Sequence, residues 1–123
     1  IILTRAEQLS RADQEIARHE IQKMVPRPVF LSEMRAMSSL SMEGKSETPE
    51  RLSKRHLFAF CALASPEAFF ATVENLGSYL RGKVAFPDHY PYRPVDLKRL
   101  MTQARSQGAK VLVTTDKDRV KIE

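Results

Sequence analysis

The segment VAFPDHYPY, residues 84–92, brings together side chains that could move a proton. Asp88 and His89 are adjacent, and two tyrosines follow them, separated by a proline. An imidazole gains and loses a proton near neutral pH, and a neighbouring carboxylate can orient its ring. Two interpretations are open. Asp88 and His89 act in catalysis, or His89 only caps the turn or stacks on Tyr90 and Tyr92.

A second polar group follows an apolar stretch near the end of the sequence. Thr114, Thr115, Lys117 and Asp118 come directly after AKVLV. Polar side chains beyond the end of a strand can reach a phosphate or a partner loop. Lys117 and Asp118 could therefore contact an anionic ligand, or they could form a structural ion pair, and the sequence favours neither.

The segment SLSMEGKS, residues 39–46, resembles a phosphate-binding P-loop but lacks one of its glycines. Ser39 stands at the first glycine position, Pro49 follows shortly after the segment, and no helical pattern continues from it. A P-loop needs both glycines, because its backbone N–H groups wrap the phosphates, and a helix that begins at the phosphates. The sequence therefore predicts no phosphate cradle here.

Composition excludes several classes of site. His19, His56, His89 and the single cysteine, Cys61, lie too far apart in sequence for a recognisable zinc site, so no metal site is predicted. Cys61 lies in the apolar run LFAFCALA and is predicted to be a small buried hydrophobe. One cysteine allows no disulfide within the chain, as fits a reducing compartment.

The charge balance favours anionic partners without choosing among them. Among 123 residues, 20 are basic and 15 acidic, which gives a net charge of +5. Because the basic residues are scattered, nucleic acid is an unlikely partner. Apolar residues make up 42% of the chain, which is typical of one globular domain. The opening residues IILT look like the middle of a core strand, which suggests a piece of a longer protein.

Hydrophobic spacing predicts elements that alternate along the chain. We expect a buried strand at IILT, a helix over 11–24 that is capped by Ser10, and a strand at RPVFLSE. Residues 34–54 are predicted to form a long polar loop or hairpin. We then expect a buried strand at HLFAFCALA, a helix from Ser65 to Gly77, a strand at YLRGKVAF, a helix that ends at Gly108, and a strand at AKVLVTT, from which the last residues trail.

This alternation predicts an α/β fold with a mostly parallel sheet and flanking helices. Ligands of such sheets bind beyond the carboxyl ends of the strands. The loops TRAEQ, PDHYPY and TTDKD all take that position.

Three blocks taken together resemble the C-terminal half of the tetraacyldisaccharide 4'-kinase family. The blocks are FCALASPEAFF, VAFPDHYPY and VLVTTDKDRVKI, and they occur in the family's order. ILTRAEQ is similar to the strand and loop that follow the family's nucleotide-binding core. The chain departs from the family at Ala62 and Ala64, where the family has glycines, and at Asp116, where it commonly has Glu.

The resemblance implies that residues 1–123 are the C-terminal portion of a P-loop-kinase-like fold whose N-terminal P-loop half is absent. It implies an enzyme that uses ATP and Mg²⁺ to phosphorylate the 4'-hydroxyl of an acylated glucosamine disaccharide 1-phosphate, giving lipid IVA in lipid A biosynthesis. The location implied is the cytoplasmic face of the bacterial inner membrane, with peripheral attachment. The fragment alone is expected to be inactive. The alternative is a stand-alone or degenerate α/β module that binds an anionic ligand or RNA.

The resemblance also implies roles for individual residues. His89 matches the family's histidine that acts with a catalytic aspartate of the N-terminal half, and Asp88 would orient it. Thr4, Arg5 and Glu7 occupy a place where many P-loop proteins read the base: Arg5 would stack on adenine and Glu7 would accept from its amino group. The alternative for that segment is a solvated loop. Tyr92 would contact the sugar or pack the loop.

Overall fold

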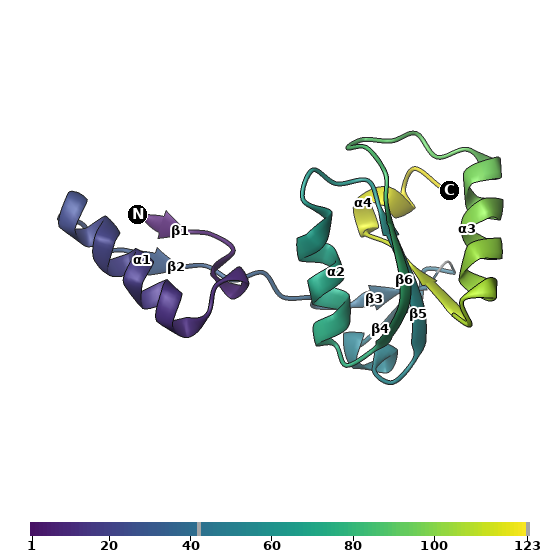
Figure 1. The fold of residues 1–123 in the computed structure, drawn as a ribbon, viewed down its shortest axis with the longest axis horizontal. Coiled ribbons are helices and arrows are strands. Elements are labelled where there is room, and N and C mark those ends of the chain that lie inside the picture. Colours follow the sequence, from purple (N-terminus) through teal and green to yellow (C-terminus); the bar gives the residue numbers. More distant parts are fainter. Residues whose placement is uncertain (42, 123) are drawn as a thin grey trace. The chain divides into compact units, whose positions relative to one another are not determined.

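The computed structural model describes residues 1–41 and 43–122, and the chain divides into two compact units, Ile1–Ala36 and Met37–Glu123. Figure 1 shows the elements of each unit. In the first unit, β1 (Ile2–Leu3) and β2 (Phe30–Leu31) pair in parallel. Between them lie a 3-10 turn, η1 (Ala6–Gln8), and the helix α1 (Arg11–Met24). The two strands and the helix of this unit therefore form as predicted.

The N-terminus of α1 shows why the helix begins where the sequence indicates. The Ser10 hydroxyl oxygen accepts the Asp13 N–H at 3.1 Å and donates to the Asp13 carboxylate at 2.6 Å. Ser10 thereby satisfies one of the backbone donors that a helix leaves unpaired at its start. With 14 residues, α1 is too short to span a bilayer, and in the described part of the chain no helix is long and apolar enough to do so.

The predicted burial of the first strand is wrong. Ile2 is 66% exposed, and in α1 the apolar residues Ile16 and Met24 are also exposed. The reason is that β1 pairs only with β2 among the described residues, and no described residue of α1 is buried. The apolar pattern therefore predicted the strands and the helix of this unit correctly, but it predicted the burial of the first strand wrongly.

The second unit begins with the segment predicted as a loop or hairpin. Within it, β3 (Ser39–Leu40) and β4 (Ser46–Glu47) pair antiparallel, and a 3-10 turn, η2 (Pro49–Leu52), follows. Met42 lies outside the described residues, and Gly44 has a φ of +77°. The P-loop-like segment thus lies in a strand pair. No α-helix begins after Lys45 within residues 43–55, as a phosphate cradle would require; the 3-10 turn η2 is the helical element that follows there.

The remaining elements form a three-layer α/β structure. They are β5 (His56–Cys61), α2 (Pro66–Asn75), β6 (Tyr79–Ala85), α3 (Pro94–Ser106), β7 (Val111–Val113) and α4 (Asp116–Arg119). All three strands are parallel in the order β6-β5-β7, so β5 is central. Figure 1 shows α2 and α3 on opposite faces of this sheet. The predicted α/β class is correct, although the parallel strands are divided between a pair in the first unit and this sheet.

The alternating side chains of β5 build a core on each face of the sheet. Phe58 and Phe60 pack with Leu100 and Ala104 of α3. Ala59 and Cys61, two residues apart on the strand, pack on the other face with Phe70 of α2. Every residue of β5 after His56 is buried, as a strand covered on both faces requires.

The end of the chain differs from its prediction. The residues DKDRVKI, 116–122, do not simply trail from β7, because Asp116–Arg119 form the single helical turn α4; Glu123 lies outside the described residues. The Thr115 hydroxyl caps this turn by accepting the Asp118 N–H at 3.2 Å. The Thr-x-x-Asp spacing that produces this cap is a signal that the sequence analysis missed.

Gly82 of β6 is required by the close packing of Phe58. A Cβ atom at Gly82 would lie 2.6 Å from the Phe58 ring and would also meet Gln107. Phe58 is completely buried and packs in the core with Phe60, Leu100 and Ala104. We therefore expect Gly82→Ala to destabilise the protein by about 1–3 kcal/mol, the usual cost of overpacking.

Urea unfolding followed by circular dichroism measures this change. The matched control is Ala85→Val in the same strand, at an exposed position, for which a change within about 0.5 kcal/mol is expected. Equal stability of the two variants would contradict the packing role of Gly82.

Candidate functional site

His89 lies in the loop between β6 and α3, at the carboxyl end of the parallel sheet. Its backbone has a φ of +59°, and its side chain is 75% exposed. The Asp88 carboxylate accepts the His89 N–H at 3.0 Å, and its other oxygen lies 3.8 Å from Nε2 of the imidazole. Asp88 therefore pairs the backbone N–H of His89 in the turn and also faces its imidazole.

The conformation of His89 favours a functional role for its side chain. A left-handed backbone costs free energy in a residue with a Cβ atom, and such residues concentrate at functional sites. Ring packing of the imidazole does not offset this cost. Among the described residues, the aromatic contacts of this loop are made by Phe86, Tyr90 and Tyr92, and His89 takes no part in them. The alternative in which His89 stacks on the tyrosines is not the arrangement observed. The catalytic role itself stays a prediction.

Aromatic rings hold the base of this loop. Phe86 packs on Tyr90 with ring centroids 4.8 Å apart and on Tyr92 at 5.2 Å, and Tyr92 packs edge-on against Phe60 of β5 at 5.6 Å. The Phe86 N–H also donates to the Cys61 carbonyl at 2.8 Å, which continues the pairing of β6 with β5. The loop therefore begins and ends on the core of the sheet.

Tyr92 has a packed ring and an unsatisfied hydroxyl. Its oxygen is buried and, like the hydroxyl of Thr114, has no hydrogen-bond partner among the described residues. Burial, followed by the charge of Asp118, raises the pKa of Tyr92 above its usual range. The packing interpretation therefore accounts for the ring, and contact of the hydroxyl with a sugar stays a prediction.

Asp96 ties the end of the loop to the N-terminus of α3. Its carboxylate accepts hydrogen bonds from the Tyr90 hydroxyl at 3.2 Å and from the Arg93 N–H at 3.0 Å, and the Arg93 guanidinium adds contacts at 3.1 and 3.3 Å. The hydrogen bond from Arg93 is the main reason why the pKa of Asp96 is held below its usual value. The sequence analysis missed Asp96, although an Asp two residues after a helix-initiating Pro is a capping signal.

Asp118 is fully buried and links three parts of the chain. One carboxylate oxygen accepts from the Ala62 N–H and from the Thr115 hydroxyl, each at 2.9 Å, and the other accepts from Lys121 at 2.9 Å. Burial by itself would raise the pKa of Asp118, but the hydrogen bonds from Ala62, Lys121 and Thr115 outweigh it and hold the pKa below its usual value. Asp118 thus stays charged and clamps α4 onto the end of β5.

The hydrogen bonds of Asp118 change the interpretation of the polar residues that follow β7. A structural ion pair of Lys117 with Asp118 was one of the two open interpretations, and Asp118 pairs instead with Lys121, because residues three apart on a helical turn lie on one side. Lys117 is exposed, so its contact with a phosphate stays a prediction. Asp118 has no exposed surface to offer a ligand in this structure, which favours the structural alternative for it.

Thr4, Arg5 and Glu7 lie in the first unit, in the loop that follows β1. Arg5 has a φ of +57° and is exposed. The Ala6 N–H donates to the Ser32 carbonyl at 3.0 Å, and Glu7 accepts the Met34 N–H at 3.1 Å, so the loop is fixed to the segment after β2. One oxygen of Glu7 is therefore already engaged, and the base-reading roles of Thr4, Arg5 and Glu7 stay predictions.

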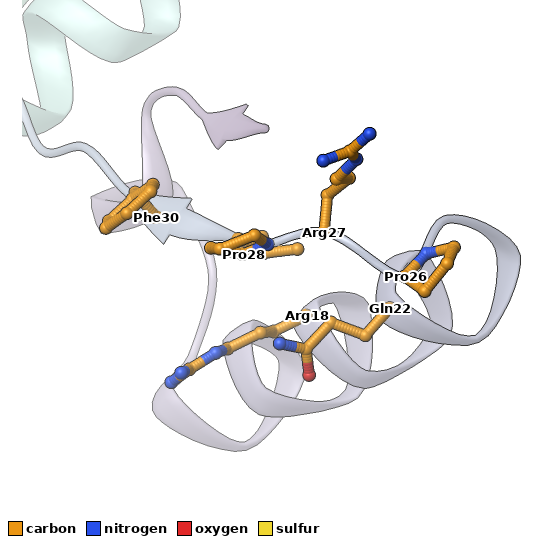
Figure 2. Close-up of a pocket in the computed structure, with 7 residues that line it drawn as sticks. Arg18, Gln22, Pro26, Arg27, Pro28 and Phe30 are labelled. Carbon is orange, nitrogen blue, oxygen red and sulfur yellow. The ribbon is translucent and has the colours of Figure 1, made fainter.

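A shallow depression of about 500 Å³ lies elsewhere on the first unit. Figure 2 shows that Arg18 and Gln22 of α1 line one side and that Pro26, Pro28 and Phe30 line the other. Its two guanidinium groups, on Arg18 and Arg27, point to different sides, so they do not converge on one anion (Figure 2). The depression also lies where β2 begins, away from the carboxyl end of that strand, where α/β ligands bind.

Neither a metal ion nor a reactive thiol is supported by the second unit. Among the described residues, no group of three or more His, Cys, Asp or Glu side chains could hold a metal ion. Burial, followed by the charge of Asp118, raises the pKa of Cys61 to about 11, so the thiol is protonated and unreactive at neutral pH. The buried position of Cys61 confirms its predicted role as a small core hydrophobe.

Comparison with known proteins gives a consistent result. The model of the family described as tetraacyldisaccharide-1-P 4'-kinase matches residues 2–123. A tetraacyldisaccharide 4'-kinase from Xanthobacter autotrophicus is 50% identical over 66 residues, which cover 54% of this chain and 19% of that protein. One from Rickettsia rickettsii is 46% identical over 67 residues, which cover 54% of this chain and 21% of that protein. The matched segments thus span about a fifth of each relative.

The fold also matches a solved structure. The crystal structure of LpxK from Aquifex aeolicus in complex with ATP superposes with a TM-score of 0.51 at 22% identity, and the match covers 98% of this chain and 42% of that one. This likeness shows that the chain shares the fold of the matched part of that structure.

The buried carboxylate of Asp118 leads to a prediction on stability and pH. Removing one partner of a buried charged network costs about 3 kcal/mol or more, so Asp118→Ala should lose at least that much free energy of unfolding at pH 7. Because the pKa of Asp118 is lowered on folding, its contribution is present above the unfolded pKa of about 3.9 and is lost as the pH falls below that value. The parent should therefore lose stability below about pH 4, and the variant should lose less.

Urea unfolding between pH 2.5 and 7 measures both effects. The control is Asp116→Asn on the same helical turn, whose carboxylate is 73% exposed and pairs with Arg119 at 3.0 Å. A surface pair contributes about 1 kcal/mol or less, so this variant should behave like the parent. Equal effects of the two substitutions would contradict the clamp.

Proposed function

The chain belongs to the tetraacyldisaccharide-1-P 4'-kinase family, and on that premise we propose that the protein containing it is an ATP-dependent lipid kinase. The reaction proposed is phosphorylation of the 4'-hydroxyl of tetraacyldisaccharide 1-phosphate, which gives lipid IVA in lipid A biosynthesis. The observation that carries the proposal is the family match over residues 2–123, together with an exposed Asp88-His89 pair at the carboxyl end of the parallel sheet. This chain supplies part of such an enzyme.

The chemistry defines what the site must do. The 4'-hydroxyl oxygen attacks the γ-phosphorus of ATP, the bond from that phosphorus to the β–γ bridging oxygen breaks, and ADP leaves while the hydroxyl proton passes to a base. Positioning and charge neutralisation supply most of the rate, and a proton acceptor supplies much of the rest. The proposal divides these tasks between this chain and the remainder of the protein.

ATP phosphates and Mg²⁺ are assigned to the remainder of the protein. Mg²⁺ neutralises charge on the phosphates during transfer, but the described residues hold no cluster of acidic or histidine side chains suited to a metal ion. The one P-loop-like segment, residues 39–46, contains the paired strands β3 and β4 and offers no helix N-terminus.

His89 is assigned to the proton transfer. Its imidazole is exposed at the carboxyl edge of the sheet, where a second carboxylate from the missing half could reach it. The resemblance implies that an aspartate of that half takes the hydroxyl proton, and His89 would stabilise or relay that proton. Asp88 holds the turn through the His89 N–H and lies 3.8 Å from the ring. Lys117 and Tyr92 are proposed contacts of the acceptor.

The location proposed is the cytoplasmic face of the bacterial inner membrane, with peripheral attachment. The acceptor is an acylated lipid, which is presented at a membrane surface. A net charge of +5 favours association with anionic headgroups. The N-terminal half of such an enzyme is the protein partner that the proposal requires, since the described residues of this chain offer no phosphate cradle.

Substitution of His89 in the complete protein tests its assignment. We expect His89→Ala to lower kcat for transfer from ATP to tetraacyldisaccharide 1-phosphate by about a hundredfold or more, the range for loss of a proton-transfer group. His89→Asn should be equally inactive, although Asn adopts the left-handed backbone readily. The measurement is steady-state phosphate transfer with purified enzyme.

The control is His19→Ala, which removes an exposed histidine on α1 and should retain full activity. An active parent whose His89 variants are unimpaired would contradict the role of His89 and leave the kinase assignment intact. A folded parent that transfers no phosphate would contradict the kinase assignment and favour a degenerate module that binds an anionic ligand.

A second prediction concerns the loop after β1. If Arg5 stacks on adenine, Arg5→Ala should raise the KM for ATP by roughly 2- to 30-fold, because a cation–π contact contributes about 0.5–2 kcal/mol. The KM for the lipid should not change. Arg11→Ala, at the exposed start of α1, is the control. An unchanged KM for ATP in the Arg5 variant would leave the loop as a solvated turn.

A further inference from the structure

We propose that Asp96 is a positioning residue for His89 and acts through the hydroxyl of Tyr90. The inference rests on the proposed function, because it assigns Asp96 to the same reaction as His89. Asp96 belongs to the first turn of α3, seven residues beyond His89, and it does not touch the imidazole. Its effect would be to fix the turn that carries His89.

The turn itself is short and closed. The Tyr90 N–H donates to the Pro87 carbonyl at 3.1 Å, so residues 87–90 form a turn with His89 at its third position. A positive φ is the conformation that one class of β-turn requires at that position. Glycine usually supplies it, and here His89 does so at +59°. The turn therefore needs support from outside to hold a residue with a side chain in this conformation.

The two ends of the turn are both anchored, in different ways. Before the turn, the Phe86 N–H donates to the Cys61 carbonyl of β5 at 2.8 Å, which makes Phe86 an extension of the sheet. After the turn, Tyr90 packs its ring on Phe86 and donates its hydroxyl to Asp96 at 3.2 Å. Only residues 87–89 lie between these anchors. A shift of Tyr90 would thus be passed directly to its neighbour His89.

Asp96 is built to hold Tyr90 firmly. Its side chain is only 10% exposed, and Arg93 contributes three of the contacts to its carboxylate. These contacts keep the carboxylate charged and fixed on the helix, and a charged acceptor forms the stronger hydrogen bond. Capping of α3 uses the Arg93 N–H. The Tyr90 hydroxyl is the contact that joins this cap to the His89 turn.

The variant Tyr90→Phe separates positioning from stability. It removes the hydroxyl donor and keeps the ring that packs on Phe86 and Tyr92. In the complete protein we expect kcat to fall roughly tenfold, equivalent to about 1.4 kcal/mol of barrier, with KM for both substrates and Tm unchanged. The His89 ring signals in ¹H–¹⁵N NMR spectra should shift or broaden, which a purely structural role of Tyr90 would not cause.

Two further variants sharpen the test. Asp96→Asn keeps an oxygen that can accept from Tyr90 but loses the charge, so its kcat should fall less than that of Tyr90→Phe. The double variant should be no worse than Tyr90→Phe alone, because both changes act on one contact. The control is Tyr79→Phe, which removes an exposed tyrosine hydroxyl at the opposite end of β6 and should match the parent.

The outcomes separate this inference from the proposed function. An active parent with an unimpaired Tyr90→Phe variant overturns the inference and leaves the function standing. A fall of kcat and Tm together, with unchanged His89 signals, also overturns it, because Tyr90 would then act on stability alone. A folded but inactive parent would overturn the proposed function. In that case the His89 signals still decide whether Asp96 and Tyr90 order the turn.

Discussion

The hydrogen bond between the Ala62 N–H and the buried carboxylate of Asp118 is the interaction on which the functional edge of this structure depends. It joins the first residue after the central strand β5 to the helical turn that follows β7. A charged group without solvent exposure is tolerated only when its hydrogen bonds are made, and Thr115 and Lys121 complete the set. The carboxyl ends of β5 and β7 are thereby fixed to each other.

This constraint also determines which loop is available for chemistry. The chain passes from β5 to β6 on one side and then to β7 on the other, so the topological switch of the sheet lies between β5 and β7. Open α/β sheets usually bind ligands at that point. Here the carboxylate of Asp118 joins the ends of β5 and β7, and the β6–α3 loop exposes His89 at this edge. The backbone of the loop begins on β5 through Phe86, and its aromatic rings rest on the same core.

The sequence predicts the local secondary structure well and the roles of buried polar groups poorly. The helix at residues 11–24 was predicted with its correct bounds, because Ser10 and the apolar spacing both mark it. The burial of β5 was predicted because an unbroken apolar run needs cover on both faces. The burial predicted for Ile2 is wrong, since the cover of a strand depends on which elements pack against it. Asp96 was missed as an anchor, and the partners of Asp118 were not predicted, because the sequence does not show which groups are placed around an acidic residue in a loop or first helical turn.

The most direct test of this account is amide hydrogen exchange at Ala62, measured by NMR in the complete protein. The account predicts that the Ala62 and Phe86 amides exchange slowly, through cooperative opening of the sheet, because each donates to a buried acceptor at the carboxyl edge. The exposed His89 amide should exchange much faster. Exchange of the Ala62 amide as fast as that of His89 would show that Asp118 does not hold this edge, and would contradict the account.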